Sequence, residues 1–242
     1  GGPGLLEVTA GRNLDLGTSG GIVSRGELDN GSLPAGGADI HLAAGVGASG
    51  IDYAGTLDRL VAKLQTGAPD DTTLWLARWL TGSDGLSETD ALAAVQSLKA
   101  LDADGQRGRV RDMLFTALRT TGRDSLQPDS PYAADYARGY AALELVFPGS
   151  GDNNADGSSK NYQGDLNLFA SRVKTERGGA IEFLLPGGNL IAGLSNTPSR
   201  LVNVGNDVLG MVVVGPGDIR GFAHDDILVN QSRILTVGGG DV

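Results

Sequence analysis

The sequence predicts a mainly β fold, a right-handed parallel β-helix or solenoid, with an inserted α-helical subdomain. The first observation behind this prediction is the distribution of glycine, of which the chain holds 39 in 242 residues. Residues 53–147 hold 8 glycines in 95 positions, whereas the other 147 positions hold 31. The second observation is that hydrophobic residues recur with a period of two outside this segment and with a helical period inside it. Two kinds of structure therefore share one chain.

Composition excludes several classes of function. The net charge is −10, with 29 acidic and 19 basic residues, so the chain lacks the clustered cations of a nucleic-acid binder or of a protein that docks on an anionic membrane. Purely apolar runs, such as the one at 211–214, are far shorter than the about 20 residues of a membrane span. The absence of cysteine excludes disulfides and thiol chemistry. Because the chain begins Gly1-Gly2-Pro3, with no initiator Met and no signal peptide, we expect it to be part of a longer protein.

Residues 1–51 are predicted to form β-helix rungs. Their short apolar runs are separated by Gly, Asn and Asp, and Leu14-Asp15-Leu16 has the alternation of a half-buried strand. Ile40-His41-Leu42 alternates in the same way, so His41 is predicted to face solvent.

Residues 53–147 are predicted to form an α-helical insertion of about five helices. Ser87-Glu88-Thr89-Asp90 resembles a capping box at the start of the third helix. Ser130-Pro131 predicts the start of the fifth helix, with proline in its first turn, and Phe147-Pro148 predicts its end. Apolar residues at helical spacing predict the faces that pack inward: Leu57, Leu60, Val61, Leu64, Leu74, Leu76, Trp79, Leu80, Leu92, Val95, Leu98, Val110, Met113, Leu114, Ala117 and Leu118.

Three tyrosines of the fifth predicted helix lie at i, i+4 spacing: Tyr132, Tyr136 and Tyr140. Such a stripe is more often part of a core than of a surface, so we predict that it packs inward. A platform on which sugars stack is the alternative.

Residues 162–242 are predicted to form further rungs that continue the solenoid. Strand-like segments recur there at uneven intervals: Leu166 to Ile181 is 15 residues, and Gly217-Asp218 to Gly240-Asp241 is 23. Uneven intervals are typical of a β-helix, because the corners vary in length while the strands stack. Glycine suits such corners, because it adopts positive φ without a steric penalty.

Several motifs together resemble one protein family. They are Tyr136-Ala137-Arg138-Gly139-Tyr140-Ala141-Ala142, Leu145-Val146-Phe147-Pro148-Gly149, Tyr162-Gln163-Gly164-Asp165-Leu166-Asn167-Leu168-Phe169, Ser171-Arg172-Val173-Lys174-Thr175, Gly178-Gly179, Leu184-Leu185-Pro186-Gly187-Gly188, Ile191-Ala192-Gly193-Leu194, and Leu228-Val229-Asn230-Gln231-Ser232-Arg233-Ile234-Leu235-Thr236-Val237-Gly238-Gly239-Gly240-Asp241. This combination resembles the domain of unknown function near the C-terminal part of filamentous-haemagglutinin-type large exoproteins, the passengers of bacterial two-partner secretion. The resemblance is strongest over residues 136–242.

The resemblance implies a secreted or surface-displayed protein of a Gram-negative bacterium. Such a passenger crosses an outer-membrane β-barrel transporter during export and acts in adhesion, biofilm formation or contact-dependent competition. The family contributes no catalytic residues, so we expect no enzyme activity and no cofactor. An unidentified surface receptor or glycan would be the binding partner.

Two motifs suggest enzyme functions from other classes. The segment 45–50 matches G-x-G-x-x-G between a strand-like and a helical pattern, which favours a dinucleotide site locally. The helices that follow lack the intervening strands of such a domain, so a corner of the solenoid is the preferred interpretation. The segment 17–21 matches G-x-S-x-G, but a strand pattern follows where a nucleophile elbow needs a helix.

Residues 148–161 are predicted to form a polar linker with weak candidates for a metal site. Asp152, Asn154 and Asp156 occupy the first three ligand positions of a calcium loop, and Gly157 occupies the sixth position. Gln163 stands where the loop needs a bidentate Glu, so no metal site is predicted.

His224-Asp225-Asp226 is the one segment where a histidine meets paired carboxylates. A β-helical polysaccharide hydrolase or lyase, the main alternative function, would use carboxylates as acid and base. Adjacent residues on a strand point to opposite faces, however, so a turn is the preferred interpretation. No catalytic residue is predicted.

Overall fold

The chain divides into two compact units in the computed structural model. The three-sheet unit consists of Gly1–Gly50 and Asp152–Val242, and the helical unit consists of Ile51–Gly151. The structure describes residues 3–27, 29–66, 69–83, 85–193 and 209–242. The part of the predicted rungs at 194–208, which includes Leu194 of the family motif, lies outside the described residues.

The predicted fold class, a mainly β right-handed parallel β-helix, is wrong for this chain, which is mixed α/β. Five helices hold about 30% of the described residues, more than the strands of the three parallel four-stranded sheets. The helices hold more residues than the strands because the strands are short. Each strand has two to six residues, whereas the longest helix has 23.

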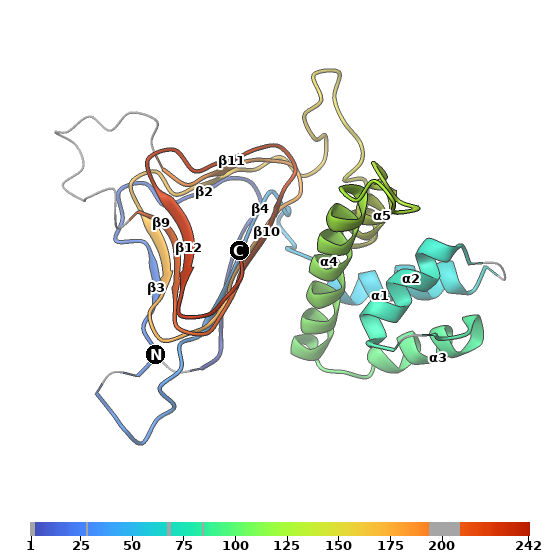
Figure 1. Ribbon diagram of the computed structural model, residues 1–242, viewed down its shortest axis with the longest axis horizontal. Helices are drawn as coiled ribbons and strands as arrows, with labels where there is room; N and C mark the ends of the chain where they lie inside the picture. Colours follow the sequence, from blue (N-terminus) through green and yellow to red (C-terminus); the bar gives the residue numbers. More distant parts are fainter. Residues whose placement is uncertain (1–2, 28, 67–68, 84, 194–208) are drawn as a thin grey trace. The chain divides into compact units, whose positions relative to one another are not determined.

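Each pass of the chain through the three sheets is one rung. The four rungs are, in order, β1 (Leu5–Ala10), β2 (Leu14–Asp15) and β3 (Ile22–Ser24); β4 (Asp39–Ala44), β5 (Leu166–Asn167) and β6 (Arg172–Thr175); β7 (Ile181–Leu185), β8 (Leu190–Ile191) and β9 (Gly210–Val214); and β10 (Ile219–Ala223), β11 (Ile227–Leu228) and β12 (Arg233–Val237). Within each sheet, every strand pairs in parallel with the strand at the same position of the neighbouring rung. Figure 1 shows the sheets along the three sides of a triangle.

The core of the three-sheet unit lies inside this triangle. Strand register stacks similar side chains in columns, so that Ile40, Ile181 and Ile219 are neighbours across three rungs. Each of these side chains is at most 4% exposed, which is worth about 1.5–3 kcal/mol per side chain. The core comprises the following buried residues: Ile40, Leu42, Ala44, Leu166, Leu168, Val173, Ile181, Phe183, Leu185, Leu190, Ala192, Met211, Val213 and Ile219.

The two predicted intervals have different meanings in the structure. Leu166 and Ile181 lie in different sheets, on β5 and β7, so their 15-residue interval is not one rung. Asp218 and Asp241 are 23 residues apart and stack directly, because the N–H of Asp241 donates to Asp218 Oδ1 at 3.0 Å. That interval is therefore one rung.

Glycine allows neighbouring rungs to approach closely at one corner. Gly21 has φ +82°, and a Cβ there would lie 2.0 Å from the carbonyl oxygen of Arg172. Gly210 has φ +101°, and a Cβ there would lie 2.0 Å from the carbonyl oxygen of Arg233. Both positions combine a backbone conformation that favours glycine with a contact that excludes any side chain.

The helical unit is inserted within the second rung, between β4 and β5. Its helices are α1 (Tyr53–Leu64), α2 (Asp71–Thr81), α3 (Glu88–Leu98), α4 (Ala103–Ser125) and α5 (Ala137–Val146). The prediction of a cap at Ser87 is confirmed, because Ser87 Oγ accepts from the N–H of Asp90 at 3.2 Å and donates to Asp90 Oδ2 at 2.7 Å. Asp70 caps α2 through the N–H of Thr73, which lowers the pKa of its carboxyl group.

Most predicted inward faces of α1 to α4 are buried, and Trp79 is the main exception at 39% exposed. The predicted start of the fifth helix at Ser130-Pro131 is wrong, because α5 begins at Ala137. Ser130 Oγ instead accepts from the N–H of Tyr132 within a turn. Ala134 follows with φ +57°, which a continuous helix does not allow.

Candidate functional site

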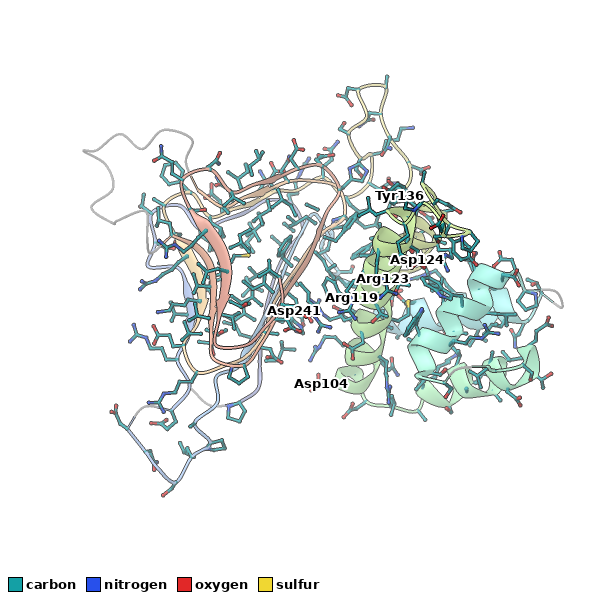
Figure 2. The ribbon with its side chains drawn as sticks, in the orientation of Figure 1. Asp104, Arg119, Arg123, Asp124, Tyr136 and Asp241 are labelled. Carbon is teal, nitrogen blue, oxygen red and sulfur yellow. The ribbon has the colours of Figure 1, made fainter. Side chains whose placement is uncertain are left out.

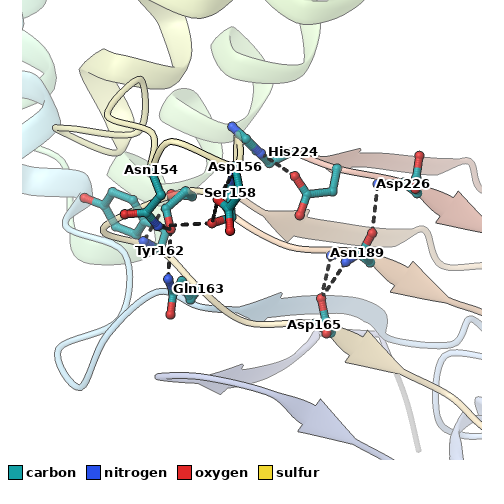
Figure 3. A network of polar contacts seen from close by, with 11 residues as sticks. Asn154, Asp156, Ser158, Tyr162, Gln163, Asp165, Asn189, His224 and Asp226 are labelled. Carbon is teal, nitrogen blue, oxygen red and sulfur yellow. Dashed lines mark hydrogen bonds and ion pairs between the residues drawn. The ribbon is translucent and has the colours of Figure 1, made fainter.

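A ladder of Asn and Asp side chains runs along the corner that precedes the second sheet. Asn13 Oδ1 accepts from the N–H of Asp165 at 3.1 Å, and Asp165 Oδ1 accepts from the N–H of Asn189 at 2.8 Å. Asn189 Oδ1 accepts in turn from the N–H of Asp226 at 3.0 Å, as Figure 3 shows. Each side chain therefore satisfies the backbone of the next rung. We call these four residues the corner ladder.

The corner ladder gives the two adjacent aspartates separate roles. Asp225 Oδ1 lies 2.8 Å from His224 Nδ1, whereas the backbone of Asp226 ends the ladder. All three residues of the predicted segment lie between β10 and β11, outside either strand. The contacts of this segment therefore belong to a corner between two strands. Arg220, which lies close in sequence, pairs with Glu182 instead.

A row of ionisable residues lies on the face of the first sheet that points away from the core. The strands place Glu7, His41, Glu182 and Arg220 side by side in successive rungs. His41 Nε2 lies 3.2 Å from Glu182 Oε2, and the Arg220 guanidinium donates to Glu182 Oε1. The Glu182 side chain is only 2% exposed, so these contacts offset the cost of burying its charge.

The prediction that His41 faces solvent is wrong, because its side chain is 14% exposed and contacts Glu182. Alternation placed His41 correctly on the face opposite the core but did not indicate its contact with Glu182 on that face. Sequence reasoning missed Glu182 altogether. The only signal in the sequence was an acidic residue within the otherwise apolar strand Ile181–Leu185. Its neighbour His41 lies 141 residues earlier in the chain, and only the strand register brings the two together.

The polar loop folds back on itself through its own side chains. Asn153 and Ser159 form an antiparallel bridge, and Asn154 Nδ2 donates to Ser158 Oγ at 3.0 Å. Asp156 Oδ1 accepts from the hydroxyl of Ser158 at 2.6 Å and from its N–H at 3.0 Å, and these bonds lower the pKa of the Asp156 carboxyl group.

The third candidate ligand of this loop also has a local donor. Asp152 Oδ2 accepts from Asn161 Nδ2 at 3.3 Å. Within the described ranges, no group of three or more His, Asp or Glu side chains is arranged to hold a metal ion. The oxygens of Asp152 and Asp156 therefore face donors of the loop itself.

The backbone of the glycine-rich segment 45–50 is used to join two rungs. The N–H groups of Gly45 and Gly47 donate to the carbonyl oxygens of Arg12 and Gly11 at 2.9 and 3.3 Å. A Cβ at Gly45 would lie 2.2 Å from the carbonyl oxygen of Tyr162. These glycines allow two backbone segments to lie close together. Their N–H groups, which a bound phosphate would need as donors, already donate to carbonyl oxygens of the chain.

The serine of the G-x-S-x-G match also lies at a corner. Ser19 Oγ is 3.0 Å from Ser171 Oγ, and the Ser171 hydroxyl donates to the carbonyl oxygen of Ser19 at 2.8 Å. β3 follows this segment, so the helix of a nucleophile elbow does not stand after Ser19.

Aromatic side chains of the helical unit form a partly exposed group. The Arg138 guanidinium lies over the rings of Tyr132 and Trp75, 3.4 and 4.7 Å from their centroids, and it pairs with Asp124 at 3.0 Å. Trp79 meets the Trp75 ring edge to face, with 6.3 Å between ring centroids. The cation therefore ties α5 and the turn before it to α2.

The predicted core stripe of tyrosines is wrong. Tyr132, Tyr136 and Tyr140 are 37%, 47% and 64% exposed. The turn at 130–136 replaces the helix on which their spacing would have formed one buried face. Figure 2 labels Tyr136 and Asp124 in this part of the helical unit. We call the aromatic residues of α2, of the turn before α5 and of α5 the aromatic group: Trp75, Trp79, Tyr132, Tyr136 and Tyr140.

A cavity of about 460 Å³ lies beside the first rung, under the loop that leads to β4. Arg25, Glu27 and Asp29 provide its charged lining. Glu27 Oε1 accepts from the N–H groups of Asp29 and Asn30, both at 3.0 Å. This carboxylate therefore shapes the loop.

Comparison of the chain with protein-family models, with curated proteins and with solved structures gives no match. None of the helices in the described parts of the chain is both long and apolar enough to span a bilayer.

Proposed function

We propose that this chain is a structural or adhesive segment, without catalytic activity, of a secreted or surface-displayed bacterial exoprotein of the filamentous-haemagglutinin type. It would cross an outer-membrane β-barrel transporter during export. Outside the cell it would contact a surface receptor or glycan in adhesion, biofilm formation or contact-dependent competition. The family motifs quoted above support this assignment, and the charge of −10 favours partners other than nucleic acid.

The aromatic group is the observation that best supports an adhesive role. Trp79, Tyr136 and Tyr140 expose 39% to 64% of their surface, although large aromatic side chains usually gain from burial. Trp, Tyr and Arg are also the residues that contribute most binding energy at protein interfaces. Arg138 orders part of the group in advance, which reduces the entropy lost on binding.

The positions of the acidic residues support a role without catalysis. Hydrolysis of a glycosidic bond needs two carboxyl groups on either side of that bond, about 5–9.5 Å apart. Three carboxyl groups of the three-sheet unit have other contacts: Asp225 faces His224, Glu182 is buried against His41 and Arg220, and Asp165 accepts bonds from Asn189.

Binding of the purified chain to bacterial and host cells and to a glycan array tests the adhesive role. We expect Trp79→Ala and Tyr136→Ala to weaken binding at least about tenfold, as loss of an interface hot spot does. Leu101→Ala is the matched control, because Leu101 is also exposed (40%) in the helical unit but stands outside the aromatic group. Equal binding by all three variants would remove the aromatic group from the proposal.

Assays with polysaccharides and with nucleotides test the alternatives. A panel of acidic and neutral polysaccharides should show no turnover, with Asp225→Asn and Asp226→Asn as comparison variants. Turnover that either substitution abolishes would replace the adhesive role with a polysaccharide hydrolase or lyase. Titration with a dinucleotide, followed by cofactor fluorescence, should show no saturable change.

A further inference from the structure

Two segments of the three-sheet unit match N-x-S/T, the acceptor sequence of N-linked glycosylation, in which the middle residue is not proline. They are Asn30-Gly31-Ser32 and Asn230-Gln231-Ser232. The first lies between β3 and β4, and the second lies between β11 and β12. A motif of three residues often occurs by chance, so the surroundings of each segment decide whether it is able to accept a sugar.

The first segment lies in an exposed loop. Residues 29–35 are all exposed. Figure 1 shows that the loop between β3 and β4 extends outward from the triangle of sheets, so a rung stacked on the triangle would not lie over it. A sugar attached to this loop would therefore meet solvent rather than a neighbouring strand.

The two groups of the first segment that take part in glycosylation are open. Asn30 Oδ1 accepts from the N–H of Ser32 at 3.0 Å, and the carbonyl oxygen of Asn30 accepts from the N–H of Leu33 at 3.0 Å. These bonds hold the segment in a turn and use only the oxygens of Asn30. Among the described residues, Asn30 Nδ2 and the Ser32 hydroxyl have no partner. The nitrogen that would bond to a sugar and the hydroxyl that the acceptor sequence requires are both accessible.

The same two groups of the second segment already have partners. Asn230 Nδ2 donates to the carbonyl oxygen of Gly193 at 2.7 Å, and the Ser232 hydroxyl donates to that of Val229 at 2.6 Å. The packing is also close, since a Cβ on Gly193 would lie 2.9 Å from the Cβ of Ser232. A sugar on Asn230 would therefore compete with a hydrogen bond in a closely packed place.

We propose that Asn30 is the acceptor of an N-linked sugar and that Asn230 is not. Asn30 Nδ2 attacks C1 of a hexose that is activated as a nucleoside diphosphate sugar. The bond from Nδ2 to C1 forms, the bond from C1 to the phosphate oxygen breaks, and the nucleoside diphosphate leaves with the electron pair. A glycosyltransferase of the producing cell binds the Ser32 hydroxyl and accepts the proton that Nδ2 loses, so this chain supplies only the acceptor.

A sugar on Asn30 would shield this loop. Exposed loops are preferred sites of proteolytic cleavage, and an attached sugar is bulky and solubilising. The turn also holds Leu33, which is 48% exposed, close to Asn30. We therefore expect proteases to cut the loop more slowly in the modified chain than in the unmodified chain. The proposal is independent of the adhesive role, since the aromatic group takes no part in it.

Transfer of glucose from UDP-glucose by a soluble asparagine glycosyltransferase tests the proposal. The folded chain is incubated with both, and peptide mass spectrometry measures the hexose on each segment. We expect Asn30 to react at least about tenfold faster than Asn230, whose amide must first give up its bond to Gly193. Asn30→Gln and Ser32→Ala should abolish transfer to the loop, whereas Ser32→Thr should retain it. Asn230→Gln is the matched control and should leave transfer to Asn30 unchanged.

Digestion of the chain before transfer separates the effect of the fold from that of the sequence. Both segments should then accept glucose, because the bonds of Asn230 and Ser232 are absent from the peptides. In the chain recovered from the cells that produce it, we expect the sugar on Asn30 and none on Asn230. Circular dichroism of the modified chain should match that of the unmodified chain.

Three results would overturn the proposal. One is transfer to Asn230 as fast as to Asn30 in the folded chain. The second is a folded chain that stays unmodified at Asn30 although its peptide accepts glucose. The third is an unmodified Asn30 in the chain recovered from the producing cells.

Discussion

Replacement of Gly21 by alanine tests how closely two rungs approach. A Cβ on Gly21 would lie 2.0 Å from the carbonyl oxygen and 2.8 Å from the nitrogen of Arg172. Both are backbone atoms, so no side-chain rotation relieves the contact. The Gly21→Ala chain must either separate the first and second rungs or abandon φ +82° at this corner.

The size of the effect follows from two costs. Positive φ costs a residue with a Cβ about 1–3 kcal/mol, and overpacking of a well-packed site costs about 1–3 kcal/mol more. Their sum, about 2–6 kcal/mol, is large against the usual 5–15 kcal/mol of folding stability. At about 2–4 °C per kcal/mol, the three-sheet unit should melt roughly 5–20 °C lower.

The assay must report each unit separately, because a chain of two units need not unfold in one step. Trp75 and Trp79 both lie in α2, so tryptophan fluorescence follows the helical unit. Hydrogen exchange of peptides that contain β3 or β6 follows the three-sheet unit. We expect Gly21→Ala to accelerate that exchange at least about 30-fold, the equivalent of 2 kcal/mol, and to leave the fluorescence transition in place.

Gly20→Ala is the matched control. A Cβ on Gly20 meets nothing within 4 Å, and its φ lies outside the positive range. We expect this variant to keep wild-type exchange or to gain up to about 1 kcal/mol from a less flexible unfolded chain. Equal stability of the Gly20→Ala and Gly21→Ala chains would refute the contact between rungs.

Three further predictions concern the corner ladder, a helix cap and the polar loop. Asn189→Ala leaves the N–H of Asp226 without its acceptor and should cost the three-sheet unit about 1–3 kcal/mol, measured by hydrogen exchange. The lowered pKa of Asp70 means that its charged form stabilises the folded helical unit at neutral pH. This contribution should disappear as pH falls below the unfolded value of about 3.9 and through the lower folded value, and Asp70→Asn should flatten the fluorescence-detected dependence. A chelator should leave the melting temperature unchanged, because Asp156 already accepts from Ser158, and a drop of several degrees would restore the calcium interpretation.

Local sequence patterns were enough to predict those elements whose stabilising contacts join residues only a few positions apart. The i, i+3, i+4, i+7 spacing located α1, and Ser87 with Asp90 located the start of α3. The distribution of glycine separated residues 53–147 from their flanks, close to the boundaries of the helical unit at Ile51–Gly151. Capping and amphipathic packing act over one or two turns of helix, so the sequence alone carries them.

Tertiary structure decided the features that depend on partners distant in the chain. The tyrosine stripe is exposed because a turn at 130–136 interrupts its helix, and that turn is stabilised by contacts such as the bond from the N–H of Ala134 to the carbonyl oxygen of Ser125. His41 and Glu182 pair across 141 residues, and Asn13 and Asp165 across 152, because parallel register brings their strands together. Side-chain alternation shows which face of a strand a residue occupies, but only the stacking of rungs determines its neighbour on that face.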